Sequence, residues 1–249
     1  MRWLAVLIAG FVAGGAAILL ANPGTTAQPA PAGAAATQIN TGVSGLHVHN
    51  PDEVAESQPD QSLDPVTRAE LGMQLTEARA VALRYPTVAD ALRGGYHLAG
   101  GFNPGTGAHY VSYSGFSGPG PVNVERPESL IYDGMSPTSR VAGLMYYAMT
   151  PTAPDGFAGP NDHWHRHRGV CVQYSAQGIN VPLPADSDVT QAQCAAVHGS
   201  FLTITGWMVH AWVVPGYESP QGVFSHSNPD LRCADGTFNT DKAGFCQGT

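Results

Sequence analysis

The segment His163-Trp164-His165-Arg166-His167 carries the clearest chemical signal in the sequence. On a β-strand alternate side chains share one face, so the three histidines would point one way and Trp164 and Arg166 the other. Histidines at i and i+2 are about 6.6 Å apart at Cα, near enough for both rings to reach one ion. His163 and His167 are about twice as far apart. The pattern predicts a metal site at His165 and His167, with His163 at its rim.

A pair of histidines needs a further ligand from another segment to hold an ion well. His210 ranks first, because residues 207–212 are apolar on both faces of a predicted strand and a buried neutral imidazole there needs a partner. His109 ranks second and His226 third. A single buried histidine is more often a hydrogen-bonded core residue, so these three are weaker candidates than the pair. An all-histidine set suits zinc, copper or iron alike.

Other chemical signatures are scarce. His47 and His49 form a second His-x-His pair in a polar segment, which we interpret as solvated. The sequence contains no Gly-x-Ser-x-Gly, no His-Glu-x-x-His, no phosphate-binding loop, no dinucleotide-binding glycine pattern and no Cys-x-x-Cys-His. No obvious general acid or base lies beside the histidines. These absences favour a binding role over an enzymatic one.

The four cysteines predict two disulfide bonds. Three pairings are possible. We expect Cys171–Cys194 and Cys233–Cys246, because each pair closes a local loop. No Cys-x-x-Cys spacing indicates a redox motif or a four-cysteine zinc site.

The N-terminal region is typical of an exported protein. Arg2 precedes residues 3–21, which carry no charge, so residues 1–27 are interpreted as a signal peptide or an N-terminal anchor. Residues 28–63 form an Ala/Pro/Gly-rich and then polar tether, and residues 64–249 a single domain. We expect secretion, a periplasmic location or a place in the cell envelope, with membrane contact only through that possible anchor.

The composition sets limits on the partners. Charged residues make up only 12% of the chain, and the formal net charge is −8 without any basic run. A nucleic-acid partner is therefore not expected. Hydrophobic residues reach 43%, which suffices for a sizeable core. A metal ion or a small molecule remains as the expected partner.

Two helices are expected at the start of the domain. Asp64 and Pro65 have the types of an N-cap and a first helical residue, and Pro86 ends the periodic pattern. Thr87 and Asp90 resemble a capping box for a short second helix. The stripe that should face the core consists of Leu71, Leu75, Ala78, Ala82 and Tyr85.

Strands follow the helices, which predicts an α+β fold: a helical pair packed on a mainly antiparallel β-sheet, rich in loops and stapled by disulfides. The residues between the strands are rich in Gly and Pro and are expected to be loops. The expected strands cover residues 109–114, 129–133, 140–149, 163–173 and 207–214.

Parts of the domain resemble an uncharacterised family of exported bacterial proteins. The resemblance spans most of residues 64–233 and implies no particular activity. It is carried by residues 85–91, by Pro-Gly-Thr-Gly-Ala-His-Tyr at 104–110, by residues 162–171 and by residues 207–229.

A further resemblance is to cupins, which hold a metal between two β-motifs. His165-Arg166-His167 is similar to the first motif, and His226 and Asn228, after the Pro-x-Gly at 220–222, look like the second. No Glu follows His167 before residue 218, and the spacing around His226 departs from the family's pattern. The resemblance implies a cupin-like histidine cluster rather than a complete cupin barrel.

Three functions follow from these observations. The first is an exported metal-binding protein with a mononuclear site at His165, His167 and His210, used for metal capture or delivery. The second is an enzyme with the same ligands and an open coordination position, which would polarise a substrate or activate O2. The third is a metal-free module that binds a ligand in an apolar cleft. The sequence does not decide whether the chain is an enzyme.

The cysteine pattern gives a first testable prediction. A chain that begins at residue 28 and is exported to the periplasm should be soluble and contain no free thiol. Alkylation under native conditions, followed by peptide mass mapping without reduction, should find peptides joined through Cys171 and Cys194. Four alkylatable thiols in the native protein would contradict the prediction.

Overall fold

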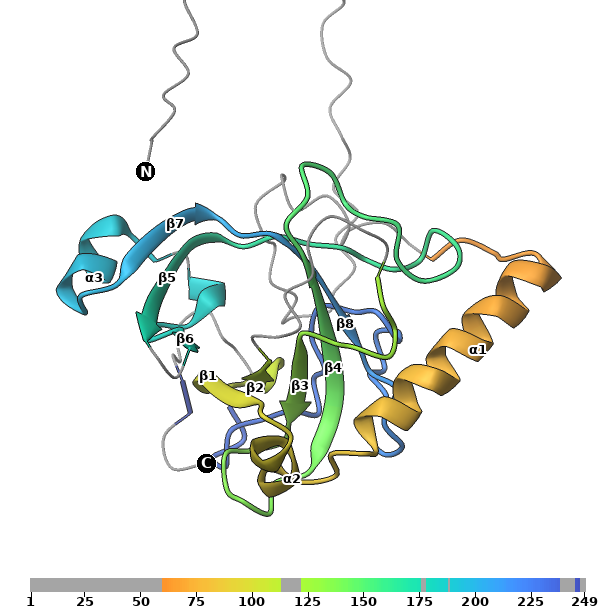
Figure 1. The fold of residues 1–249 in the computed structure, drawn as a ribbon, viewed down its shortest axis with the longest axis horizontal. Helices are drawn as coiled ribbons and strands as arrows, with labels where there is room; N and C mark the ends of the chain where they lie inside the picture. Colours follow the sequence, from red (N-terminus) through yellow and green to blue (C-terminus); the bar gives the residue numbers. More distant parts are fainter. Residues whose placement is uncertain (1–59, 113–121, 176–177, 188, 238–244, 247–249) are drawn as a thin grey trace, which may run out of the picture. The chain divides into compact units, whose positions relative to one another are not determined.

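Three α-helices and eight strands, joined by long loops, make up the part of the chain that the structure describes (Figure 1). This computed structural model describes residues 60–112, 122–175, 178–187, 189–237 and 245–246. The predicted signal segment, most of the tether and the His47/His49 pair lie outside these residues. The elements are α1 (Pro65–Ala82), α2 (Val88–Arg93), β1 (His97–Asn103), β2 (Gly107–Val111), β3 (Ser129–Tyr132), β4 (Val141–Ala148), β5 (Arg168–Ser175), β6 (Gly178–Asn180), η1 (Ala185–Ser187), α3 (Gln191–Ala196), β7 (Ser200–Ile204) and β8 (Trp207–Ala211).

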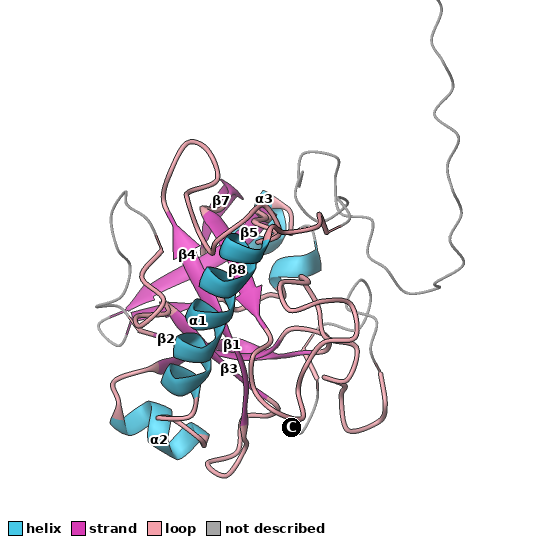
Figure 2. Cartoon of the chain, turned by 90° about the vertical axis from the view of Figure 1, so that its right-hand side faces the viewer, coloured by secondary structure: helices cyan, strands magenta, loops and turns pink. Residues whose placement is uncertain are grey.

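The two predicted N-terminal helices are present, with the predicted caps. Asp64 Oδ1 accepts hydrogen bonds from the backbone N–H groups of Val66 and Thr67, which satisfies donors that the first turn leaves free. Thr87 and Asp90 form the expected capping box of α2. Helix α1 packs against β4, as Figures 1 and 2 show. No helix among the described residues is long and apolar enough to span a membrane.

The larger sheet is antiparallel, with strand order β1-β2-β3-β4-β8. Its last pair joins distant parts of the chain, and Met145 of β4 lies opposite His210 of β8. Because side chains alternate along a strand, each strand supplies two distinct surfaces. One surface carries His109, Met145, Tyr147, Met208 and His210, and the other carries Tyr110, Leu130, Leu144, Tyr146 and Val209.

The side of the large sheet that carries Leu144 and Tyr146 belongs to the main hydrophobic core. Ala78 and Ala82 of α1 are completely buried in the same cluster, so the predicted apolar stripe does face the core. Leu71 joins it from the helix as a partly buried side chain. Burying such aliphatic and aromatic side chains supplies the main favourable term in folding. The α+β class predicted from the sequence is therefore the observed one.

A smaller antiparallel sheet has the order β6-β5-β7 and carries one of the two disulfides. Cys171 of β5 pairs with Cys194 of α3, and Cys233 pairs with Cys246 near the end of the chain. Both predicted pairings are confirmed. Two disulfides in one domain indicate an oxidising compartment.

The prediction of a strand at residues 163–173 is wrong for its first five residues. Strand β5 starts only at Arg168, and His165 forms an isolated bridge to Met208 instead of a regular strand. The chain changes partner here: His165 pairs with the large sheet, whereas Arg168 pairs with Ile204 of the small sheet. A segment that passes from one sheet to another cannot keep one continuous ladder.

Strands β1, β6 and β7 and helix α3 lie in regions expected from the sequence to be loops. In β1 the misleading signal is Gly100-Gly101. A Cβ at Gly101 would lie 2.6 Å from the Phe245 ring, so the glycine makes room for the C-terminal segment held by Cys246. Glycine in a strand can mark such a close approach. The sequence pattern alone does not distinguish this case from a loop.

Thr205-Gly206 separates β7 from β8 and marks the junction of the two sheets. The N–H of Gly206 donates to Tyr147 Oη at 2.7 Å. A Cβ at Gly206 would lie 2.6 Å from the carbonyl oxygen of Ala148 and 2.7 Å from the Tyr147 ring. Glycine is therefore required at the junction by the close approach of β4.

This packing predicts opposite effects for two glycine substitutions. Gly206→Ala should destabilise the domain by about 1–3 kcal/mol, because the methyl group overlaps the backbone of β4. Gly72→Ala is the matched control: Gly72 lies in α1, a Cβ there would have nothing within 4 Å, and the change should stabilise by about 0.5–1 kcal/mol. Urea unfolding of both variants measures the effects, and equal stabilities would refute the assigned packing.

Candidate metal centre

Three histidines from two distant segments converge on one point. His165, His167 and His226 each offer a ring nitrogen, and these nitrogens all lie within 4.8 Å of one another. The ring centroids of His165 and His226 are 4.4 Å apart, and His167 lies 5.3 Å from each of the other two. Small side-chain rotations would bring the three nitrogens to a distance of 2.0–2.1 Å from one ion, which is the length of a Zn–N bond. The arrangement is therefore a candidate site for one ion.

Backbone hydrogen bonds fix the first two histidines at the sheet junction. His165 and Met208 exchange both backbone hydrogen bonds, each at 2.9 Å. Thr205 donates its N–H to the His167 carbonyl, and its hydroxyl accepts from the His167 N–H at 3.0 Å. The side chain of Thr205 thus replaces a backbone acceptor where the regular ladder is interrupted. Arg166 projects away from the cluster, 5.1 Å over the Trp207 ring.

His226 comes from the loop after β8, and its neighbours are tied to the core. Trp212 Nε1 donates to the Ser225 carbonyl at 2.7 Å. Asn228 is completely buried, donates its backbone N–H to the Gly105 carbonyl and its side-chain amide to the Tyr217 carbonyl. These bonds place the loop beside the junction, although it lies about sixty residues further along the chain.

His210, which the sequence favoured most as the third ligand, lies next to the three-histidine group. It contacts the backbone of His226. Its Nδ1 lies 2.6 Å from the His226 carbonyl oxygen. A carbonyl oxygen only accepts, so Nδ1 carries the proton, and the neutral ring then has its lone pair at Nε2. This Nε2 lies 3.4 Å from His109 Nε2. His210 is thus placed to orient His226 through its backbone, as outer-sphere partners of metal ligands do.

The remaining predicted residues do not belong to the three-histidine group. His109, half-buried on β2, contacts His210. His163 Nε2 lies 2.7 Å from a carboxylate oxygen of Asp60, so its ring is directed to the segment that precedes α1.

The protonation states suit metal binding. Burial is the main cause that lowers the pKa of His165 well below its usual range, and the neighbouring His226 and His167 add to it. Burial likewise lowers the pKa of His210, followed by the effect of His109. His165 Nδ1 faces the His163 carbonyl at 3.4 Å, which leaves the lone pair at Nε2.

An orphaned nitrogen in this cluster is the structural argument for a ligand. His165 is 1% exposed, and its Nε2 has no hydrogen-bond partner among the described residues. Leaving a buried polar atom without a partner is unfavourable, and native structures seldom do so. A metal ion bound by this lone pair would satisfy the nitrogen.

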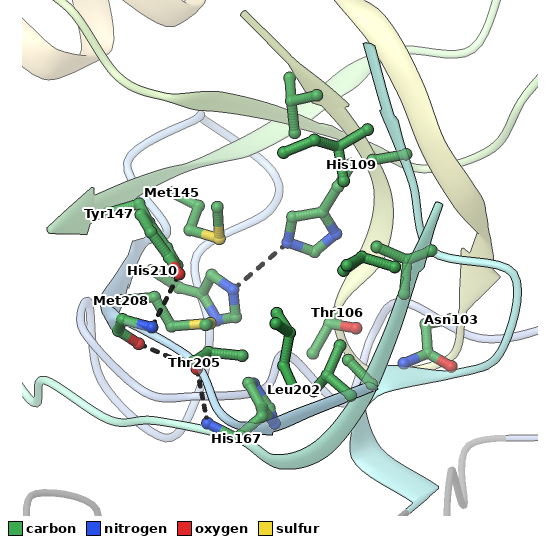
Figure 3. Close-up of a pocket in the computed structure, with 18 of the residues that line it drawn as sticks. Asn103, Thr106, His109, Met145, Tyr147, His167, Leu202, Thr205, Met208 and His210 are labelled. Atoms are coloured by element: carbon green, nitrogen blue, oxygen red, sulfur yellow. Dashed lines mark hydrogen bonds between the residues drawn. The ribbon is translucent and has the colours of Figure 1, made fainter. Parts of the chain in front are cut away.

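A cavity of about 430 Å³ adjoins the cluster between the inner faces of the two sheets. His167 lines it, as do His109 and His210, and Figure 3 shows these three rings pointing into it. Met145 and Met208 lie on the same wall. The candidate metal centre is therefore connected to a chamber of small-molecule size.

No protein-family model, no curated protein and no solved structure matches the chain. Membership of the exported bacterial family and of the cupins stays a prediction. The cupin-like pattern did contain a usable signal, because it associated His226 with His165 and His167.

The contact between His210 and His226 predicts a difference between two substitutions. His210→Asn keeps a donor near the position of Nδ1 and should hold metal within a few fold of the wild type. His210→Ala loses the donor and should bind metal about 10–100-fold more weakly. Competition with a chromophoric chelator measures both affinities. Equal losses in both variants would instead make His210 a ligand.

The lowered pKa values predict how the metal-free protein responds to pH. Below pH 6.5 the unfolded chain takes up protons at residues 165 and 210 while the folded protein does not, so unfolding becomes easier as the pH falls. The free energy of unfolding should fall by up to about 1.4 kcal/mol per pH unit for each histidine. Urea titrations between pH 7 and pH 5 measure this slope.

His165→Phe should reduce the slope, because it removes a buried ring whose pKa is lowered by burial. A pH-independent stability of the wild type over this interval would show that neither buried ring remains neutral.

Proposed function

We propose that the domain binds one transition-metal ion at His165, His167 and His226 and uses it as a resident ion for chemistry in the adjoining cavity. The observation that carries the proposal is the convergence of three ring nitrogens within 4.8 Å of one another, in a group where the buried His165 Nε2 has no hydrogen-bond partner among the described residues. Zinc, copper and iron all accept imidazole ligands, and the residues do not select among them.

Three ligands distinguish this site from a structural one. Structural zinc sites use four protein ligands, whereas catalytic sites use three and leave a position for water or substrate. Among the described residues, three histidines have ring nitrogens within 4.8 Å of one another. One of them, His167, also lines the cavity. An ion bound by these three histidines would keep a coordination position open toward the cavity, and this supports an enzymatic role. Such an ion would act as a Lewis acid.

Metal capture or delivery, the role first predicted from the sequence, is the less favoured one. A carrier must present its ligands to a donor or acceptor, but His165 and His167 are 1% and 6% exposed. Ligands this deeply buried favour an ion that stays bound. Slow release of the bound ion to excess chelator, over hours, would agree with a resident ion, whereas release within seconds would favour delivery.

Metal loading tests the binding itself. Protein stripped with chelator and dialysed against Zn²⁺ should contain one ion per chain by mass spectrometry of the elements. His226→Ala and His167→Ala should each lower the affinity at least tenfold, because two histidines hold an ion poorly. His163→Ala is the matched control and should bind normally, since its ring lies against Asp60.

Because His165 and His167 are buried, their variants need a check of folding by circular dichroism. His226 is less buried and provides the decisive variant if the others unfold. Wild-type metal content in the His167→Ala, His226→Ala double variant would remove the site from this cluster.

Cobalt tests the open position. Co²⁺-loaded protein should show tetrahedral d–d bands that shift when azide is added, because a small anion can enter a free coordination position. A spectrum that does not respond to azide at any concentration would indicate a closed site, and would favour a structural ion.

A further inference from the structure

The cavity beside the metal centre is enclosed by alternate residues of both sheets. Strands β5 and β7 contribute Val170, Val172, Leu202 and Ile204, which share a face because they are two residues apart within each strand. The large sheet contributes its inner face opposite them. Small-molecule sites occupy about 300–1,000 Å³, and this cavity of about 430 Å³ falls in that range.

The charge of the lining restricts what the cavity can hold. Among the described residues that line it, none is Lys, Arg, Asp or Glu. Without a bound metal ion, a carboxylate or phosphate would lose its water there without gaining a cationic partner, which is strongly unfavourable. An ammonium group would likewise meet no carboxylate. In the metal-free protein the occupant should therefore be uncharged.

Three histidines are among the few polar side chains of the lining. In Figure 3 His109 lies above the cavity, His210 on its left and His167, with Thr205 near it, below, while Thr106 and Asn103 lie on the right. Most of the remaining lining is apolar, with aliphatic side chains such as Val170 and Leu202. An apolar body would contact the aliphatic side chains and a single polar group would reach a histidine, as in small-molecule sites with few polar anchors.

We propose that this cavity binds an uncharged, largely aliphatic small molecule with one polar end group that contacts the histidines of the lining. Occupation of the cavity is independent of the proposed metal function. The placement of the end group beside the ion rests on that function. If the ion is absent, the same cavity makes the domain a metal-free ligand-binding module.

The occupant class is tested first on metal-free protein at pH 8, with N-phenyl-1-naphthylamine as a neutral fluorescent reporter. The reporter should bind at one site per chain. Decan-1-ol should displace it at concentrations at least tenfold lower than decanoate or decylammonium, which are charged at this pH. Equal or tighter binding of either charged chain, or no displacement by decan-1-ol, would overturn the proposal.

Adjacent positions on β7 provide a matched pair of variants. Leu202 lines the cavity, and Thr203 is exposed on the other face of the strand. Leu202→Trp should weaken decan-1-ol binding at least tenfold by filling the cavity, and Thr203→Trp should leave it unchanged. If Leu202→Trp fails to fold, Leu202→Ala replaces it. The enlarged cavity should then favour dodecan-1-ol over decan-1-ol relative to the wild type, and an unchanged preference would contradict the location.

Zinc loading separates the cavity from the metal. Decane-1-thiol should bind at least tenfold more tightly to zinc-loaded than to metal-free protein, because its sulfur can ligate the ion, whereas decane should bind both equally. Alcohol binding without any zinc binding would defeat the proposed metal function and leave the cavity proposal standing. Zinc binding without alcohol binding would defeat the cavity proposal and leave the proposed metal function standing.

Discussion

The pairing of residues 165–167 with residues 205–208 is the interaction on which the rest of the site depends. Two backbone hydrogen bonds join His165 to Met208, and two more bonds join His167 to Thr205. The first pair belongs to the edge of the large sheet, and the chain continues from the second into β5 of the small sheet. The same few bonds thus hold two histidines, join the sheets and define one end of the cavity. A change there would move the histidines and the cavity wall together.

Exclusion of water gives the histidine cluster its chemical character. In contact with water these rings would titrate near pH 6.5, but burial lowers the pKa of His165 and His210 and keeps both rings neutral. Two backbone carbonyls, those of residues 163 and 226, accept from the Nδ1 atoms of these rings and leave the Nε2 lone pairs available. A neutral nitrogen with a fixed lone pair is what a metal ion requires. The same burial makes the cluster unfavourable without a ligand, because the lone pair of His165 Nε2 then has no hydrogen-bond donor among the described residues.

The cavity and the candidate metal centre share His167, and this connection limits the chemistry. Aliphatic walls exclude water and lower the local dielectric constant, which strengthens the interaction of an ion with any polar group close to it. An uncharged ligand loses little on entering such a space, whereas a charged one loses its hydration. The absence of Lys, Arg, Asp and Glu from the described lining therefore complements the all-histidine ligand set. If the proposed ion is bound, both features would favour an apolar molecule beside it.

The sequence by itself determined those features that depend on neighbouring residues. The caps at Asp64 and Thr87, the apolar stripe of α1, strands β3 and β4 and both disulfides follow from short-range patterns, and each is present. The alternation that separates His165 and His167 from Arg166 is also local, and it survives although the segment is not a regular strand.

Tertiary structure decided which histidine completes the group. His210 lies in the most apolar strand and is therefore the leading candidate from the sequence, yet the strand directs its Nε2 toward His109 and its Nδ1 toward the His226 backbone. His226 lies in a loop without periodicity, and its position follows from bonds that its neighbours Ser225 and Asn228 make to Trp212 and Tyr217 and to Gly105, which is distant in sequence. The glycines of β1 and of the sheet junction are equally ambiguous, because the atoms they make room for belong to other segments. Local patterns fix which way a side chain points along its own strand, but only the packing of separate segments determines what it meets.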